Sequence, residues 1–183
     1  CFGLELDPAA VKAARQRGLE VEEGAYDRLA AYPGRFDCIV CSHVLEHVHA
    51  PLDLLEKLNV ALKPGGVLLL SAPNAMSKAS DFFGPYWRGL EAPRHLAIPA
   101  VPFLRDHLCA MGLQVSQQIF QTFPTIAESL QIKQKVLSGG EAGVGTVKRI
   151  RKLLGRPTAD QVDFIELVCV KPLSSHVGGH GSA

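Results

Sequence analysis

The sequence predicts an α/β fold built on a doubly wound, mostly parallel β-sheet, and three observations support this prediction. Residues 36–41 and 66–72 are short apolar runs without polar alternation, as expected for parallel strands covered on both faces. Residues 51–62 between them have the spacing of an amphipathic helix. The first two dozen residues have a strand, helix, strand pattern. Strands that alternate with helices in this way are typical of the class.

The N-terminal elements follow from local signals. Residues 1–6 are mostly apolar and predict a strand that leads directly into a helix, with Asp7 as its N-cap and Pro8 as its first residue. Gly18 predicts the end of this helix, and extended structure resumes at residues 19–21.

The central elements are predicted with similar detail. Residues 36–41 should form a central strand, and the helix over residues 51–62 should stop at the K-P-G-G run of residues 63–66. A second buried strand then covers residues 66–72.

The second half has weaker patterns. Residues 77–94 predict a long irregular segment, of the kind that often carries function. A helix is expected at 101–111, a strand at 113–120, a helical region with glycine interruptions at 125–155 and a last strand at 164–171. We therefore expect one domain over residues 1–173, with variable segments at 75–96 and 121–160, and a disordered tail at 174–183.

Composition excludes several classes of protein. Nineteen basic and eighteen acidic side chains leave no net field that indicates nucleic-acid binding, although Lys148, Arg149, Arg151 and Lys152 form a local basic cluster. No apolar run approaches the roughly 20 residues that a membrane span needs. Five cysteines without a leader sequence favour a reducing compartment, so we expect a cytoplasmic protein.

Specific motifs begin at residue 36. They read F-D-C-I-V-C-S-H-V-L-E-H-V, then a helix, then L-K-P-G-G-V-L-L-L-S-A-P-N, with G-L-E-L-D-P upstream at residues 3–8 and W-R-G-L-E-A-P-R-H-L downstream at residues 87–96. In this order they resemble class I S-adenosylmethionine (SAM)-dependent methyltransferases, above all the branch of ubiquinone-type O-methyltransferases. The resemblance implies SAM as cofactor, a small-molecule acceptor and an antiparallel final strand, and it covers residues 1 to about 120 and the last strand.

The resemblance assigns the cofactor residues to strand ends. Glu5, with the adjoining Leu6, ends the first strand, where a carboxylate can accept hydrogen bonds from both ribose hydroxyls. Ala25 and Tyr26 stand near the expected adenine, although Ala25 replaces a common aspartate and a simple loop is the alternative. The remaining predicted cofactor contacts, which follow the strand over residues 36–41, are Ser42, His43 and Glu46.

Two histidines are the predicted catalytic residues. His47 and His95 are candidate general bases, because imidazole titrates near neutral pH. Trp87 and Arg94 are predicted to contact the substrate, with Arg94 holding an acidic group through its planar fork of donors. The alternative is structural: His47 caps a helix or bonds backbone, and the residues from Trp87 to His95 only pin a loop to its own domain.

We expect no metal site. The spacing of Cys38, Cys41, His43 and His47 superficially resembles a zinc motif, but residues three apart on a strand point to opposite faces.

One expected motif does not occur. SAM-binding folds of this class have a glycine-rich turn after the first strand, and no such turn precedes Glu5. We therefore expect the sequence to lack the first strand and helix of the fold, a strand that would lie between residues 1–6 and 36–41. Two alternatives stay open, namely an NAD-type Rossmann enzyme and a non-catalytic SAM-binding or regulatory domain.

Overall fold

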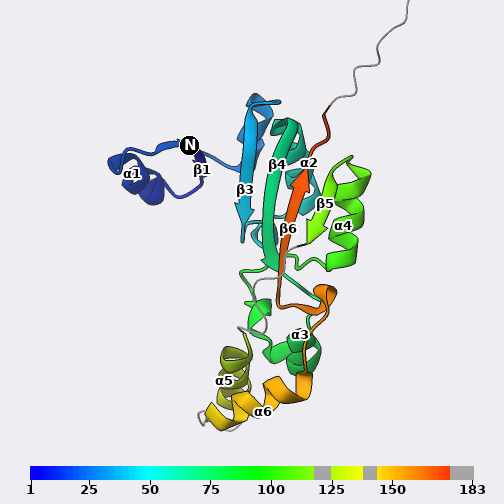
Figure 1. Ribbon diagram of the computed structural model, residues 1–183. Helices are drawn as coiled ribbons and strands as arrows, with labels where there is room; N and C mark the ends of the chain where they lie inside the picture. Colours follow the sequence, from blue (N-terminus) through cyan, green and yellow to red (C-terminus); the bar gives the residue numbers. More distant parts are fainter. Residues whose placement is uncertain (118–124, 138–143, 174–183) are drawn as a thin grey trace, which may run out of the picture.

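The strands of the protein form two separate sheets (Figure 1). The computed structural model describes residues 1–117, 125–137 and 144–173. β1 (Phe2–Glu5) pairs in parallel with β2 (Glu20–Glu23). The larger sheet has the order β3-β4-β6-β5, with the bounds β3 (Phe36–Ser42), β4 (Leu62–Pro73), β5 (Gln114–Gln117) and β6 (Phe164–Val170). The α/β class is therefore confirmed.

The N-terminal unit forms as its sequence predicts. α1 (Pro8–Gln16) follows β1 directly, and the Asp7 side chain accepts a hydrogen bond from the Ala9 amide at 2.8 Å. Gly18 has a φ of +78°, the left-handed conformation that glycine adopts at the end of a helix. This unit lies at the side of the larger sheet, next to β3 (Figure 1).

The larger sheet is mixed. β3 and β4 run parallel, while β6 is antiparallel to both β4 and β5, which confirms the antiparallel final strand. The boundary before β4 differs from the prediction. α2 (Pro51–Ala61) ends one residue before β4 begins at Leu62, so the predicted stop at residues 63–66 lies inside the strand. Gly65 is held there because its amide donates to the Lys171 carbonyl at 2.8 Å.

One face of this sheet is sealed by two helices. α2 and α4 (Val101–Ala110) pack against alternate residues of the strands, including Leu68 and Leu70 of β4 and Ile165 and Leu167 of β6. These four side chains are at most 2% exposed. Burial of apolar side chains against helices is the main source of stability for such a layer.

The opposite face is open in the described chain. Val40 of β3 is 67% exposed and Leu69 of β4 is 39% exposed, and no described helix lies across them (Figure 1). The prediction that β3 is a central strand covered on both faces therefore differs from the structure, where β3 is an edge strand of the larger sheet. The sequence encodes apolar residues on both faces, but helices of the described chain cover only one of them.

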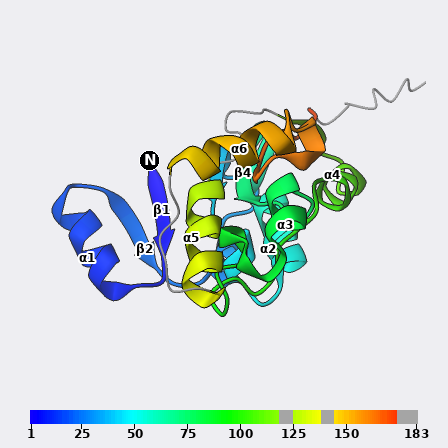
Figure 2. The same cartoon turned by 90° about the horizontal axis from the view of Figure 1, so that it is seen from below.

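A second apolar cluster lies at one end of the molecule. There α3 (Lys78–Phe83) packs with α5 (Ile126–Leu137) and α6 (Val144–Leu154), as Figures 1 and 2 show. The segment predicted to be irregular contains this first helix and two short 3₁₀ helices, η3 (Gly84–Tyr86) and η4 (Arg88–Leu90). Trp87 between them is buried in the cluster.

Some predictions fall outside the described residues. These are the tail at 174–183, residues 118–120 of the strand predicted at 113–120 and, within the variable segment 121–160, residues 121–124 and 138–143. Across the parts that are described, the helices are too short or too polar to cross a bilayer.

Candidate active site

A polar cavity of about 320 Å³ opens beyond the carboxyl end of β3. It lies between the residues that follow β3, the segment after η3, the first turn of α5 and the start of β6. In an open α/β sheet this is the end at which ligands bind. The residues that line it are His43, Glu46, His47, Arg88, Gly89, Glu91, Arg94, His95, Thr125, Glu128 and Phe164.

The chain turns sharply into this cavity after β3. The His43 amide donates to the Ser71 carbonyl of β4 at 2.9 Å, which extends the pairing of the two strands by one residue. His43 itself has a φ of +52°, a conformation that non-glycine residues rarely adopt outside constrained sites. The short 3₁₀ helix η2 (Leu45–His47) follows, with Leu45 and Glu46 buried.

A distant segment is joined to η2 by backbone hydrogen bonds. The Leu96 amide donates to the Glu46 carbonyl at 2.7 Å, and the His47 imidazole Nδ1 lies 3.0 Å from the Arg94 carbonyl oxygen. This pairing brings together the rings of His47 and His95, whose centroids are 4.8 Å apart. Both predicted bases therefore lie in one cavity, although they are far apart in the sequence.

The hydrogen bonds of these two histidines indicate which ring nitrogen carries the proton in the neutral form. His95 Nδ1 lies 2.7 Å from the Gly89 carbonyl oxygen, as His47 Nδ1 lies beside that of Arg94. A carbonyl oxygen only accepts, so Nδ1 carries the proton in both rings. Nε2 then has the lone pair in the neutral form of each ring, although the Glu91 carboxylate 3.6 Å from His95 Nε2 favours a proton on that atom. The cavity thus holds two nitrogen atoms that can accept a proton.

Glu46 is the buried acid of the cavity. Its Oε1 accepts a hydrogen bond from His43 Nδ1 at 3.0 Å, whereas its buried Oε2 has no partner in the structure. A buried acceptor without a partner is costly unless a bound molecule or water supplies a donor. Burial, together with the Glu46 carboxylate, raises the pKa of the nearby Cys41 thiol to about 12, so this cysteine stays neutral and unreactive.

Glu91 connects the charged groups on the other side. Its carboxylate accepts from Arg88 Nη1 at 2.6 Å and from Arg94 Nη1 at 2.8 Å, and its Oε2 lies 3.6 Å from His95 Nε2. The Arg88 guanidinium is the main cause of a lowered pKa for Glu91, with smaller contributions from Arg94 and His95. Glu91 therefore remains ionised near neutral pH and orients two guanidinium groups.

Trp87 has the contacts of a core residue. It is 2% exposed, and its indole Nε1 donates to the Thr125 hydroxyl at 3.3 Å. It does not line the cavity, in contrast to Arg94, whose side chain is 73% exposed there. This packing supports the alternative in which Trp87 pins the loop to its own domain. A side chain buried in this way does not contact a substrate in the cavity.

The predicted ribose ligand lies elsewhere in the structure. Glu5 Oε1 accepts hydrogen bonds from the backbone amides of Leu6 at 2.7 Å and Asp7 at 2.9 Å. Glu5 and Leu6 are exposed at the end of β1, and neither lines the polar cavity. The structure therefore does not join Glu5 to His43 and Glu46 in one cavity, and their shared role in holding a cofactor stays a prediction.

Ala25 and Tyr26 are also outside the cavity. Ala25 precedes η1 (Tyr26–Ala31), and Tyr26 packs partly against the main core with the Lys57 ammonium 5.2 Å from its ring centre. Burial and a hydrogen bond to Asp53 raise the pKa of Tyr26. Ser42 lies on the open face of the sheet, beside Val40 and Leu69, in a smaller hollow of about 240 Å³.

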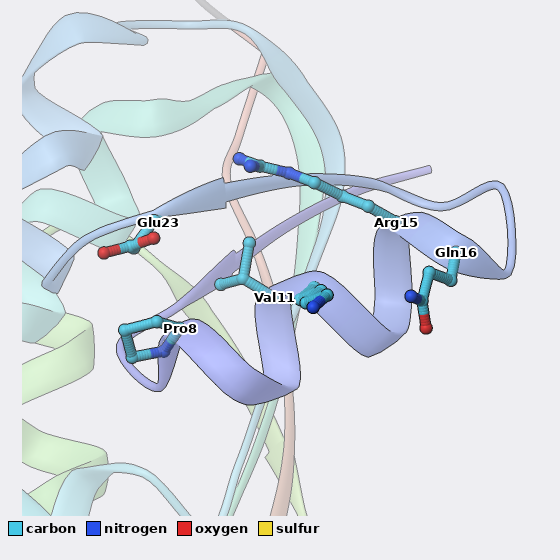
Figure 3. A pocket seen from close by; sticks show the side chains of 6 residues that line it. Pro8, Val11, Arg15, Gln16 and Glu23 are labelled. Atoms are coloured by element: carbon cyan, nitrogen blue, oxygen red, sulfur yellow. The ribbon is translucent and has the colours of Figure 1, made fainter.

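Another hollow contains none of the predicted site residues. It measures about 500 Å³ and lies against α1 and β2, as Figure 3 shows for Pro8, Val11, Arg15, Gln16 and Glu23. The Arg15 guanidinium donates twice to the Val21 carbonyl and holds the helix to the strand. This hollow is an open surface beside the N-terminal unit, whereas the polar cavity brings together acids, bases and guanidinium groups.

The described residues include one group with the donor atoms for a cation. Glu46, His47 and His95 each offer one ligand atom, and these three atoms lie within 4.8 Å of one another. Cys38 and Cys41, the cysteines of the zinc-like spacing, are not part of this group. On β3, Cys38 is exposed and Cys41 is buried. The same two histidines are also the candidate bases, so a cation and a base role are competing interpretations.

Sequence reasoning missed several lining residues. Glu91 is the most important of these, and its position three and four residues before Arg94 and His95 was a usable signal. Thr125, Glu128 and Phe164 reach the cavity from α5 and β6 through the fold alone, and no local pattern identifies them.

Comparison with known families gives a match over most of the chain. The family model Methyltransf_23, described as a methyltransferase domain, matches residues 1–118. A ubiquinone biosynthesis O-methyltransferase from Xanthomonas campestris pv. campestris (strain B100) is 38% identical over 78 residues, 39% of this chain and 33% of that protein. One from Histophilus somni is 34% identical over 88 residues, 42% of this chain and 37% of that protein. The chain thus spans about a third of the length of these relatives.

Solved structures agree on the fold. YcgJ from Bacillus subtilis has a TM-score of 0.63 at 16% identity, over 94% of this chain and 82% of that one. A SAM-dependent methyltransferase from Thermotoga maritima, described as a possible histamine N-methyltransferase, has a TM-score of 0.60 at 17% identity, over 93% and 72% of the two chains. At these identities the likeness concerns the fold alone.

Proposed function

Since the chain belongs to the methyltransferase-domain family, we propose that it transfers a methyl group from SAM to a small-molecule acceptor bound in the polar cavity. The fold of the solved neighbours and the position of the cavity beyond β3 support this proposal. The observation that carries it is the contact of Nδ1 with a carbonyl oxygen in both His47 and His95, which leaves Nε2 of the neutral ring to accept a proton, because a methyl acceptor with a hydroxyl group must lose its proton.

The residues present fit a cofactor that is rich in hydrogen-bond donors. SAM supplies an electrophilic methyl group on a sulfonium ion, and it carries an ammonium group and two ribose hydroxyls as donors. Among the described residues, Glu46 Oε2 is a buried acceptor without a partner. Glu5 uses Oε1 for its two backbone hydrogen bonds, and its Oε2 can accept a further one. We assign Glu5 to the ribose and Glu46, with His43 and Ser42, to the remainder of the cofactor. Leu6, Ala25 and Tyr26 stay predicted contacts of the nucleoside.

The histidines are proposed to remove the acceptor's proton. His47 is exposed to the cavity, and its Nε2 takes the proton while Nδ1 stays bonded to the Arg94 carbonyl. His95 Nε2 lies beside the Glu91 carboxylate, which would stabilise an imidazolium formed there. For methyl transfer, alignment of the acceptor with the methyl group contributes as much as the base.

Arg94 is proposed to bind an acidic group of the acceptor. Its Nη1 is bonded to Glu91, and the remaining donors of the guanidinium are on a side chain that is largely exposed. A planar guanidinium fixed on one side presents a fork that suits a carboxylate or a phosphate. The five free thiols support a cytoplasmic location for this chemistry.

A transfer assay with methyl-tritiated SAM tests the proposal. We expect labelled product from a small-molecule extract, and we expect isothermal titration to detect binding of SAM and S-adenosylhomocysteine but not of NAD. Binding of NAD in preference to SAM would favour the dinucleotide enzyme. Binding of SAM without any labelled product would favour a non-catalytic domain.

A chelator separates the base from the cation interpretation. If His47 and His95 act as bases, prolonged dialysis against EDTA leaves the transfer rate unchanged. If they hold a cation with Glu46, the rate falls and returns on addition of a divalent metal. The second result would contradict the general-base role.

A further inference from the structure

Charge is distributed unevenly over the molecule. The described helices α5 and α6 carry one acidic residue, Glu128, and six basic residues, whereas the whole chain is almost neutral. Glu128 lies in the first turn of α5 and lines the polar cavity, and every other charged residue of the two helices is basic. The six cations are Lys133, Lys135, Lys148, Arg149, Arg151 and Lys152.

α6 presents its cations outward. Ile150 is buried in the second apolar cluster, with Val147 and Leu154 packed against it on the same side of the helix. The helical period places Lys148 and Lys152 on the opposite side, and both are exposed. Across the part of the chain that the structure describes, no carboxylate pairs with any of the four α6 cations.

Exposed aliphatic side chains accompany these cations. Leu153 of α6 is 73% exposed, and Val136 and Leu137 in the last turn of α5 are 64% and 62% exposed. On the neighbouring α3, Phe82 is 38% exposed, and the Lys133 ammonium lies 6.0 Å from its ring centre. Figures 1 and 2 show α5 and α6 side by side at one end of the molecule, away from the sheet. We call this end the basic lobe.

Cations interspersed with exposed aliphatic side chains match the interface of an anionic bilayer. The cations gain from the negative surface potential, while leucine and valine gain by entering the boundary between headgroups and acyl chains. A nucleic acid would use the cations but would offer nothing to the aliphatic groups, since it is bound through phosphates and base stacking. We propose that the basic lobe binds the surface of a membrane that contains anionic lipids.

This proposal goes beyond methyl transfer and does not depend on it. It rests on side chains of α5 and α6 that do not line the polar cavity, and binding to vesicles is measurable without SAM or an acceptor. The two proposals therefore succeed or fail separately.

Co-sedimentation of the 183-residue chain with vesicles tests the proposal. We expect the protein to pellet with vesicles of phosphatidylcholine that contain phosphatidylglycerol, and to stay in the supernatant with phosphatidylcholine alone. Raising the salt concentration should release it in part, because exposed charges are screened. No pelleting with either vesicle, or equal pelleting with both, overturns the proposal.

Two variants of the basic lobe sharpen the test. The double substitution Lys148→Glu and Lys152→Glu should weaken partitioning to anionic vesicles at least tenfold, because each basic residue near such a surface contributes separately. Leu153→Gln, which removes the aliphatic side chain without changing the charge, should weaken it as well at unchanged ionic strength, which a purely electrostatic or nucleic-acid site would not predict. All three side chains are exposed, so circular dichroism should show an unchanged fold.

The matched control reverses two charges elsewhere. Lys12→Glu with Arg17→Glu changes the net charge equally at α1, where both residues are exposed. We expect it to keep most of the vesicle binding. An equal loss in this control would show that only net charge matters, and binding of RNA that survives Leu153→Gln while vesicles are not bound would replace the membrane with a nucleic acid. Either result overturns the proposal.

Discussion

The cavity around His47 and His95 and the end of β1 around Glu5 are assigned to one reaction, but they are held in different ways. In the cavity, His47 bonds to the carbonyl of a residue 47 positions away, and Leu96 bonds back to Glu46. Among the described residues, the Glu5 carboxylate bonds only to the two amides that follow it. The cavity is thus fixed by tertiary structure, whereas the proposed ribose contact is fixed by its own strand end.

The difference teaches where pre-organisation resides in this chain. Groups held by long-range bonds and burial keep their geometry without a ligand, which is what catalysis by positioning requires. A carboxylate held by adjacent amides keeps its local orientation but is not placed against the groups across the site. We therefore expect substitutions around the cavity to have larger effects than substitutions at the end of β1.

The largest expected effect is at His47. His47→Gln keeps a donor for the Arg94 carbonyl but removes the proton acceptor, so the rate of methyl transfer should fall by about 10²- to 10⁴-fold. The exposed His49 provides the control, since His49→Gln should leave the rate nearly unchanged. Equal rates for the two variants would remove the base from the mechanism.

Trp87 should have the next largest effect, and it acts on stability. Trp87→Ala empties a buried site and leaves Thr125 without its indole donor, so the free energy of unfolding should fall by about 3–5 kcal/mol. Denaturant unfolding measures this change. Phe103 is 55% exposed, and Phe103→Ala should cost less than about 1 kcal/mol. Similar costs for both would contradict a core role for Trp87.

Glu5 should have a moderate effect that is confined to the cofactor. Glu5→Gln removes a charged acceptor for a ribose hydroxyl, and the Kd for SAM should rise by about tenfold or more. Glu23 is its register partner at the end of β2, and Glu23→Gln should bind SAM as the wild type does. Calorimetric titration with SAM measures the Kd of both variants. Equal Kd values would contradict the assignment of Glu5 to the ribose.

The smallest expected effect is a dependence of stability on pH. Burial raises the pKa of Asp163, which accepts from the Thr125 amide and hydroxyl, so its ionised form is disfavoured in the folded state. The stability that its protonated form contributes is lost as the pH rises through that raised pKa. The wild type should therefore melt at a higher temperature in mildly acidic than in neutral buffer.

Asp163→Asn should reduce this dependence. Lowered pKa values at Asp53 and Glu91 act in the opposite sense and only below the ordinary carboxyl range, so they do not obscure it. A steeper gain in melting temperature on acidification of the variant would contradict the assignment to Asp163.

Much of the fold could be predicted because local signals act alone. The Asp7 cap with Pro8, the period of residues 51–61 and the apolar run of β6 each specify one element without distant partners. The exposed face of β3 could not be predicted. The apolar Val40 suits a strand face that is covered by a helix, but the sequence does not show whether a helix of the chain lies there.

The site followed the same division. His47 and His95 were predicted from their motifs, and the structure brings their rings together. Trp87, the predicted substrate contact, lies in the core instead. The sequence does not reveal whether an aromatic residue in a loop faces the core or the cavity. Glu91 was missed because its importance comes from binding Arg88, Arg94 and His95 at once, which only the folded loop shows.

The protonation of the two histidine rings tests the central claim most directly. Nitrogen NMR of the imidazoles distinguishes a protonated from an unprotonated ring nitrogen at mildly alkaline pH, without SAM or an acceptor. We predict a protonated Nδ1 and a free Nε2 in both His47 and His95, as their carbonyl partners require. A proton on Nε2 of either ring would leave it without a lone pair toward the acceptor and would contradict the proposed mechanism.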